Sequence, residues 1–178
     1  VFRGKLDIPV IDWRHYLEDE LDMHNSHQSF AARQRLLNYD GDASNQVIWF
    51  TDARPTGPMF DQTPMALEVI DEWMANIAAN PDRSVARNRP ARAVDSCFAT
   101  DGSLIASGRR VWDGVLDDER APGACTQRFP IYSSSRRVAG APYEGGVWKC
   151  AVQSVDDALD DDVYGDWDSV KEAATSTG

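Results

Sequence analysis

Two short apolar runs in the first third of the chain predict buried strands. Residues 6–13 read LDIPVIDW and residues 46–50 read QVIWF, and both are rich in Ile, Val and Trp. Runs of this length with little polar alternation are typical of strands in parallel sheets, which are covered on both faces. We therefore expect two parallel strands here.

A helix is predicted to follow the first strand. Asn25 or Ser26 is a suitable N-cap, and Phe30, Arg33 and Leu37 are spaced three and four residues apart, as on one face of a helix. The helix should end at Gly41, which lies among Asp and Asn residues that favour a turn.

The clearest helix signal comes after the second strand. Thr63 is the expected N-cap, with Pro64 at the first helical position, and Asn80 and Pro81 end the helix. The positions expected to form one apolar stripe are Leu67, Ile70, Trp73, Met74 and Ile77.

The order strand, acidic loop, helix, strand, loop, helix indicates an α/β fold with crossover helices. After Pro81 the pattern changes to short apolar pieces with Gly and Pro, and only GGVWKCAVQSV, residues 145–155, resembles a further strand. We thus expect three parts: strands and helices at 1–80, a loop-rich extension with short β segments at 81–155, and an acidic, partly disordered tail at 156–178.

Two parallel strands cannot cover their own faces, so the predicted sheet lacks strands. We expect an upstream portion of the same polypeptide, or a second chain, to complete it. The chain would then be the C-terminal part of a larger α/β sheet.

Composition narrows the possible partners. The formal net charge of −11 argues against nucleic acid, since phosphate binding needs clustered Lys and Arg. No apolar run approaches the roughly 18 residues of a membrane span. The chain holds three cysteines, Cys97, Cys125 and Cys150, whose spacing argues against zinc. We expect two of them to pair, with Cys97–Cys125 the first choice and three buried thiols the alternative.

All three histidines of the chain, His15, His24 and His27, fall within residues 8–30 together with several acids. This segment follows the first predicted strand, and the loops at the carboxyl ends of parallel strands are where α/β folds place their sites.

An acid after the penultimate strand orients the catalytic histidine in α/β-hydrolases. Asp22 is the first candidate for this acid, with Asp19 second, whereas Asp12 lies in or at the end of the strand. The loop after the second strand contains no histidine, so His24, His27 or His15 would have to act as the base. No G-x-S-x-G motif is present in the chain, and a complete triad is therefore not encoded in it.

Two other interpretations fit the same residues. The segment DELDMHNSH is also suited to a polar loop that caps the helix. A metal site is the third interpretation, although the spacing matches no known ligand motif. Its ligands would be Asp19, Asp22, His24 and His27.

Several separated blocks of the sequence resemble one protein family. IPVIDWRHYLEDELDMHNSHQSFAARQRL is followed by NQVIWF, AVDSCF, GACTQRFPIYSSSR and GGVWKC. Together they resemble the C-terminal third of a family of exported bacterial proteins of uncharacterised function. That family is distantly similar to the tannase and feruloyl esterase branch of the α/β-hydrolases.

The resemblance implies an ester or amide hydrolase whose nucleophilic serine lies upstream of these residues and whose substrate is a small molecule. Asp22 would supply the acid and His24 the base, and no cofactor or metal is implied. The alternative is a binding subunit that has kept the fold without the chemistry. The matching cysteine blocks also imply disulfides and an exported setting.

Overall fold

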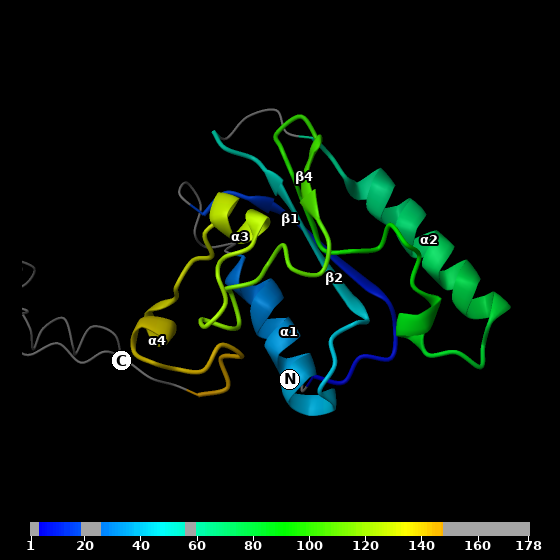
Figure 1. Ribbon diagram of the computed structural model, residues 1–178, viewed down its shortest axis with the longest axis horizontal. Helices are drawn as coiled ribbons and strands as arrows, with labels where there is room; N and C mark the ends of the chain where they lie inside the picture. Colours follow the sequence, from blue (N-terminus) through cyan, green and yellow to red (C-terminus); the bar gives the residue numbers. More distant parts are fainter. Residues whose placement is uncertain (1–3, 19–25, 56–59, 148–178) are drawn as a thin grey trace, which may run out of the picture.

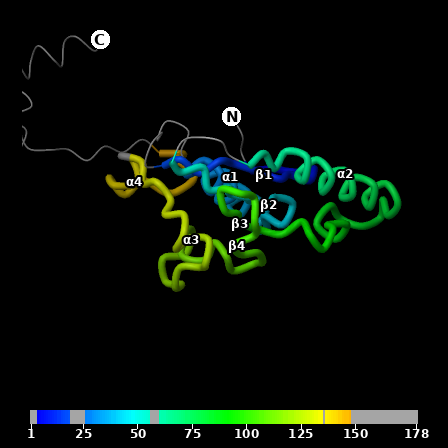
Figure 2. The backbone as a smooth tube through the Cα atoms, turned by 90° about the horizontal axis from the view of Figure 1, so that it is seen from above, coloured from blue at the N-terminus to red at the C-terminus, as the bar shows by residue number. Residues whose placement is uncertain are grey.

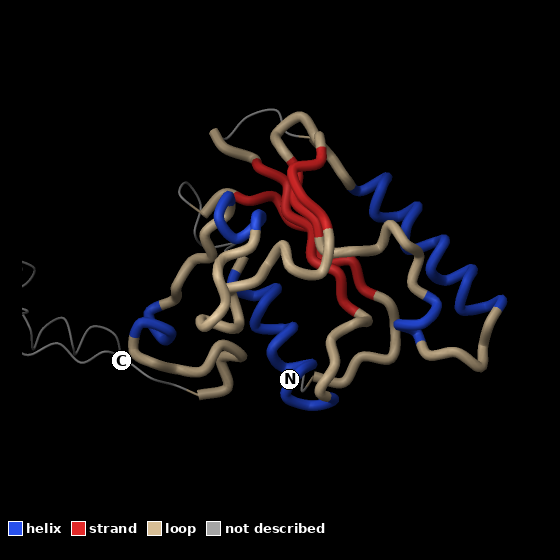
Figure 3. Tube along the Cα trace, in the orientation of Figure 1, coloured by secondary structure: helices blue, strands red, loops and turns tan. Residues whose placement is uncertain are grey.

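A four-stranded mixed sheet in the order β1–β2–β3–β4 forms the centre of the molecule (Figure 1). The computed structural model describes residues 4–18, 26–55 and 60–147. Strands β1 (Val10–Tyr16), β2 (Gln46–Asp52) and β3 (Ser96–Phe98) are parallel, and β4 (Leu104–Ser107) runs antiparallel to β3. The strands, red in Figure 3, confirm the α/β prediction in its general form.

The two predicted strands are confirmed as β1 and β2. The segment that was expected to form a loop-rich extension contributes β3 and β4 to the same sheet. Of the possible strand at 145–155, residues 148–155 lie outside the described part of the chain, as does the acidic tail.

The two faces of the sheet carry separate cores, because successive side chains of β2 point to opposite sides. Val47 and Trp49 pack with Val69 and Trp73 of helix α2 (Thr63–Ala79). The opposite face carries a larger cluster that includes side chains from helix α1 (His27–Asp40) and the segment after β4. Its buried members are Tyr16, Phe30, Ile48, Phe50, Cys97, Val111, Trp112, Val115, Cys125 and Phe129.

Helix α1 begins and ends as predicted. Its N-cap is Ser26, and Gly41 follows the last turn with φ 70°, in the left-handed region that glycine favours. The N–H of Gly41 donates to the carbonyl of Leu37 at 2.9 Å, which closes the final turn.

Helix α2 corrects part of the sequence prediction. Its N-cap is Gln62 instead of Thr63, one residue earlier than expected. Leu67 and Met74 were placed in the buried stripe but are 62% and 49% exposed. Trp73 determines which face of α2 packs against the sheet, because its ring is fully buried and its Nε1–H donates to the carbonyl of Val85 at 2.8 Å.

The remaining elements are short. They are the 3₁₀ helix η2 (Val85–Asn88) and helices α3 (Ala124–Arg128) and α4 (Ser135–Val138). Figure 2 shows α2 at one end of the molecule and α4 at the other. Across the described ranges, no helix has both the length and the apolar character needed to cross a bilayer.

A disulfide joins Cys97 of β3 to Cys125 of α3, as expected, across a separation of 28 residues. Both half-cystines are buried in the larger core. The bond therefore ties the irregular segment after β4 to the sheet.

Candidate active site

The carboxyl ends of β1 and β2 lie side by side, with Tyr16 opposite Asp52 in the register. Because the strands are parallel, the segments that follow them, 17–26 and 53–62, both leave from this edge of the sheet. Ligand sites of α/β sheets lie outside the carboxyl ends of the strands. This edge is therefore where a site is expected.

Glu18 holds the two ends of the first of these segments together. One oxygen of its carboxylate accepts a hydrogen bond from the N–H of Ser26, and the other accepts from the N–H of Tyr132 at 2.9 Å. Glu18 and Ser26, the described residues on either side of 19–25 in the sequence, are therefore in direct contact.

The two residues predicted to be catalytic, Asp22 and His24, lie outside the described residues, as does Asp19. Asp12 lies within β1, as the sequence suggested. Its carboxylate is 3.3 Å from the Arg14 Nε and accepts a hydrogen bond from the Gln46 side chain at 3.3 Å. These partners make Asp12 a structural residue of the strand.

The other two histidines lie in different elements, His15 in β1 and His27 at the start of α1. His15, near the end of β1, packs edge-on against Trp13 with ring centroids 4.9 Å apart. Its Nε2 is 3.3 Å from the carbonyl oxygen of Phe60, in the segment after β2. His15 is therefore placed where the segments after both strands meet.

His27 is the first residue of α1 and is buried. Its ring stacks on Tyr143 with centroids 4.5 Å apart. Burial lowers the pKa of His27, and the positive charges of Arg137 and Arg35 lower it further. The imidazole is thus held in its neutral form in a cationic environment.

Asp52 forms an ion-pair network that the sequence analysis missed. Its buried carboxylate receives the Arg54 Nε at 2.9 Å and the Arg128 Nη2 at 2.8 Å. Burial acts to raise the pKa of Asp52, but the hydrogen bonds from Arg54 and the charges of both arginines outweigh it and lower the pKa below its ordinary value. Its oxygens are already paired, so Asp52 joins the segment after β2 to α3.

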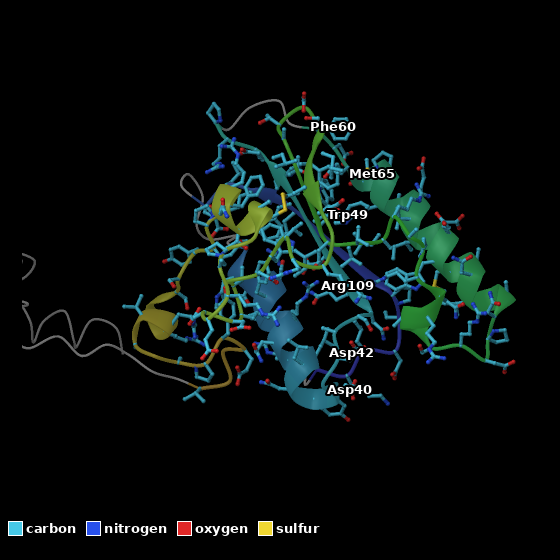
Figure 4. All side chains as sticks on the ribbon, viewed as in Figure 1. Asp40, Asp42, Trp49, Phe60, Met65 and Arg109 are labelled. Atoms are coloured by element: carbon cyan, nitrogen blue, oxygen red, sulfur yellow. A yellow bond between two sulfur atoms is a disulfide. The ribbon has the colours of Figure 1, made fainter. Side chains whose placement is uncertain are left out.

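An apolar cavity of about 720 Å³ lies between α2 and the sheet. Trp49, Phe60 and Met65, labelled in Figure 4, are among the residues that line it. Gly102 allows the Phe60 ring to approach the β3–β4 turn, because its φ is +84° and an added Cβ would lie 2.4 Å from the Phe60 Cγ. Phe60 also contacts His15, so the cavity adjoins the carboxyl edge.

The metal interpretation finds no support in the described part of the chain. Residues 4–18, 26–55 and 60–147 contain no group of three or more His, Cys, Asp or Glu side chains arranged to hold an ion. Of the four ligands considered, only His27 lies within these ranges, and Arg35 and Arg137 are the charges near it.

The described fold is an α/β unit in which the parallel strands β1 and β2 end side by side at one edge of the sheet. The chain belongs to a tannase-like family of unknown function (DUF6351), whose sequence profile matches residues 2–173. The resemblance to the tannase branch is thereby confirmed. No curated protein and no solved structure matches the chain.

Proposed function

We propose that this chain supplies the acid and the base of a serine-type ester or amide hydrolase, with the nucleophile outside these 178 residues. Asp22 is the acid and His24 the base. The observation that carries the proposal is the contact between Glu18 and Ser26 at the carboxyl edge of β1, because Asp22 and His24 lie between these two residues in the sequence. Membership of a tannase-like family supports ester hydrolysis as the reaction class.

The proposed chemistry follows from these roles. His24 accepts the proton of the serine hydroxyl as its oxygen attacks the substrate carbonyl, and Asp22 stabilises the resulting imidazolium. The proton then passes to the leaving alcohol or amine as its bond to carbon breaks. Water, activated in turn by His24, releases the acid and regenerates the serine. The cavity beside Phe60 is the proposed place for an apolar part of the substrate.

The nucleophile would come from strands on the far side of β1. In the described sheet β1 is an edge strand, bonded only to β2, while β2 is bonded on both sides. We propose that the upstream portion of the polypeptide, or a second chain, pairs with the open edge of β1 and extends an α/β-hydrolase-like parallel sheet. Unpaired edge strands are prone to such pairing.

We further propose that the protein is exported from a bacterial cell. The Cys97–Cys125 disulfide supports this location, because structural disulfides persist in oxidising compartments.

Covalent labelling tests the proposed function directly. A fluorophosphonate reacts with a serine only when a neighbouring base activates it, forming a Ser–O–P bond and releasing fluoride. We expect the chain joined to its upstream portion to be labelled at one upstream serine, mapped by peptide mass spectrometry. His24→Ala should abolish the labelling and His27→Ala should leave it, because His27 is buried in α1.

A non-catalytic binding subunit is the second candidate. Its support is the absence of histidine from residues 53–62, the segment after β2, where hydrolases of this type carry their base. Absence of labelling, together with saturable binding of an ester that is not turned over, would favour this candidate.

A further inference from the structure

A second, smaller cavity of about 210 Å³ lies between the start of α1 and α4. Arg35, Arg136 and Arg137 line it, together with His27 and Ser134. None of the described residues that line it is acidic. The described lining of the cavity is thus positively charged, whereas the whole chain carries a net charge of −11.

Two of these arginines are fixed in place by neutral partners. The Nε and Nη2 groups of Arg35 donate to the carbonyl of Glu144, and the Nη1 of Arg137 donates to the carbonyl of Ala141 at 3.1 Å. The Arg137 guanidinium also lies 4.7 Å from the centroid of the Tyr143 ring. Carbonyl oxygens and aromatic rings orient a guanidinium group without neutralising its charge. These contacts therefore leave the positive charges of Arg35 and Arg137 beside the cavity.

Helix α1 contributes His27 to this cavity. At the amino end of the helix the N–H of Ser26 donates to the carboxylate of Glu18, so the partial positive charge of that end is already compensated. His27, at the first position, is 5% exposed, and its Nδ1 has no hydrogen-bond partner among the described residues.

We propose that this cavity is a binding site for a small oxyanion, either a free phosphate-like ion or the terminal phosphate group of a larger molecule. Arg35 and Arg137 form charge-assisted hydrogen bonds with the oxygens, and the Nδ1 of His27, which has no partner among the described residues, is available for a further hydrogen bond. The cavity is small, which limits the bound part to one such group. The inference is independent of the proposed hydrolase activity.

Inorganic phosphate is the first probe, titrated into the chain at constant ionic strength with chloride as the replaced anion. The readout is the NMR signal of the His27 ring. The charged and titratable groups around this ring are Arg35 on its own helix, Arg136 and Arg137 on α4, and Tyr143 in the loop that follows. The carboxylate of Glu18, bonded to the N–H of the preceding residue Ser26, is the acidic group beside them. We expect a saturable shift and a higher pKa of His27 with phosphate bound, because an anion favours the imidazolium.

Variants separate the site from general charge effects. Arg137→Gln should weaken phosphate binding about tenfold, as expected for loss of one charge-assisted contact. Arg110→Gln removes the same charge from a side chain that is 85% exposed, and it should leave binding unchanged. If Arg137→Gln does not fold, Arg137→Lys keeps the charge without the planar fork, and it should bind phosphate more weakly than the wild type.

Phenyl phosphate distinguishes the two sources of the oxyanion. Binding at least as tight as that of phosphate assigns the site to the terminal group of a larger molecule, and weaker binding assigns it to the free ion. The proposal is overturned if neither probe shifts the His27 signal beyond the chloride control, or if Arg110→Gln weakens binding as much as Arg137→Gln.

Discussion

The Cys97–Cys125 disulfide offers the clearest quantitative test of the fold. Replacing both residues by Ala removes the link between β3 and α3 while leaving the sheet hydrogen bonds in place. The bond closes a loop with a sequence separation of 28 residues. On the chain-entropy relation, a loop of this size contributes about 3.6 kcal/mol at 25 °C by restricting the unfolded chain.

The loss should therefore be at least ~3.6 kcal/mol, because two buried sulfur atoms are removed as well. That is a large part of the roughly 5–15 kcal/mol by which single domains are stable. Urea unfolding of the chain joined to its upstream portion, followed by tryptophan fluorescence, measures the difference. The wild type should lose a similar amount when a reductant is added, and the double variant should not respond to it. A loss below about 1 kcal/mol, or an equal response of both proteins to reductant, would refute the reasoning.

Two further predictions concern stability. Asp52→Asn should destabilise the chain by about 2–3 kcal/mol, less than a fully buried pair because Arg128 is half exposed. Since the folded pKa of Asp52 is below its ordinary value of 3.8, its contribution is complete above that pH and is lost as the pH falls through the folded pKa. The unfolding free energy of Asp52→Asn should accordingly depend less on acid, and an unchanged pH profile would argue against the network. On α2, Trp73→Ala should cost about 3–5 kcal/mol and Leu67→Ala less than ~0.5 kcal/mol, and equal losses in urea unfolding would contradict the orientation of the helix.

The elements that the sequence predicted well are those specified by local signals. Continuous apolar runs marked β1 and β2, and Gly41 and Pro64 marked helix ends. Strands β3 and β4, with three and four residues, are too short to show a period, and they are strands because of their pairing with neighbours. On α2, apolar residues extend over more than one face, so the pattern alone did not decide which of them would face the sheet.

The candidate site also combines features that local sequence signals predict with features that depend on contacts in the folded chain. The concentration of histidines and acids in residues 8–30 predicted a site at this edge from the sequence alone. The contact of Glu18 with Tyr132 joins residues 114 positions apart, and that of Asp52 with Arg128 joins residues 76 apart. Such pairs arise only in the folded chain. A single local signal existed for Asp52, which is an acid at the end of a buried strand two residues before an arginine.

The central claim is that residues 19–25 carry the acid and base of an ester hydrolase. Its most direct test is kcat/KM of His24→Ala for a chromogenic ester, measured beside His27→Ala in the chain joined to its upstream portion, with the Tm of each. We predict a loss of at least about 10³-fold for His24→Ala at an unchanged Tm, and a much smaller loss for His27→Ala. Activity of His24→Ala within a few-fold of the wild type would contradict it.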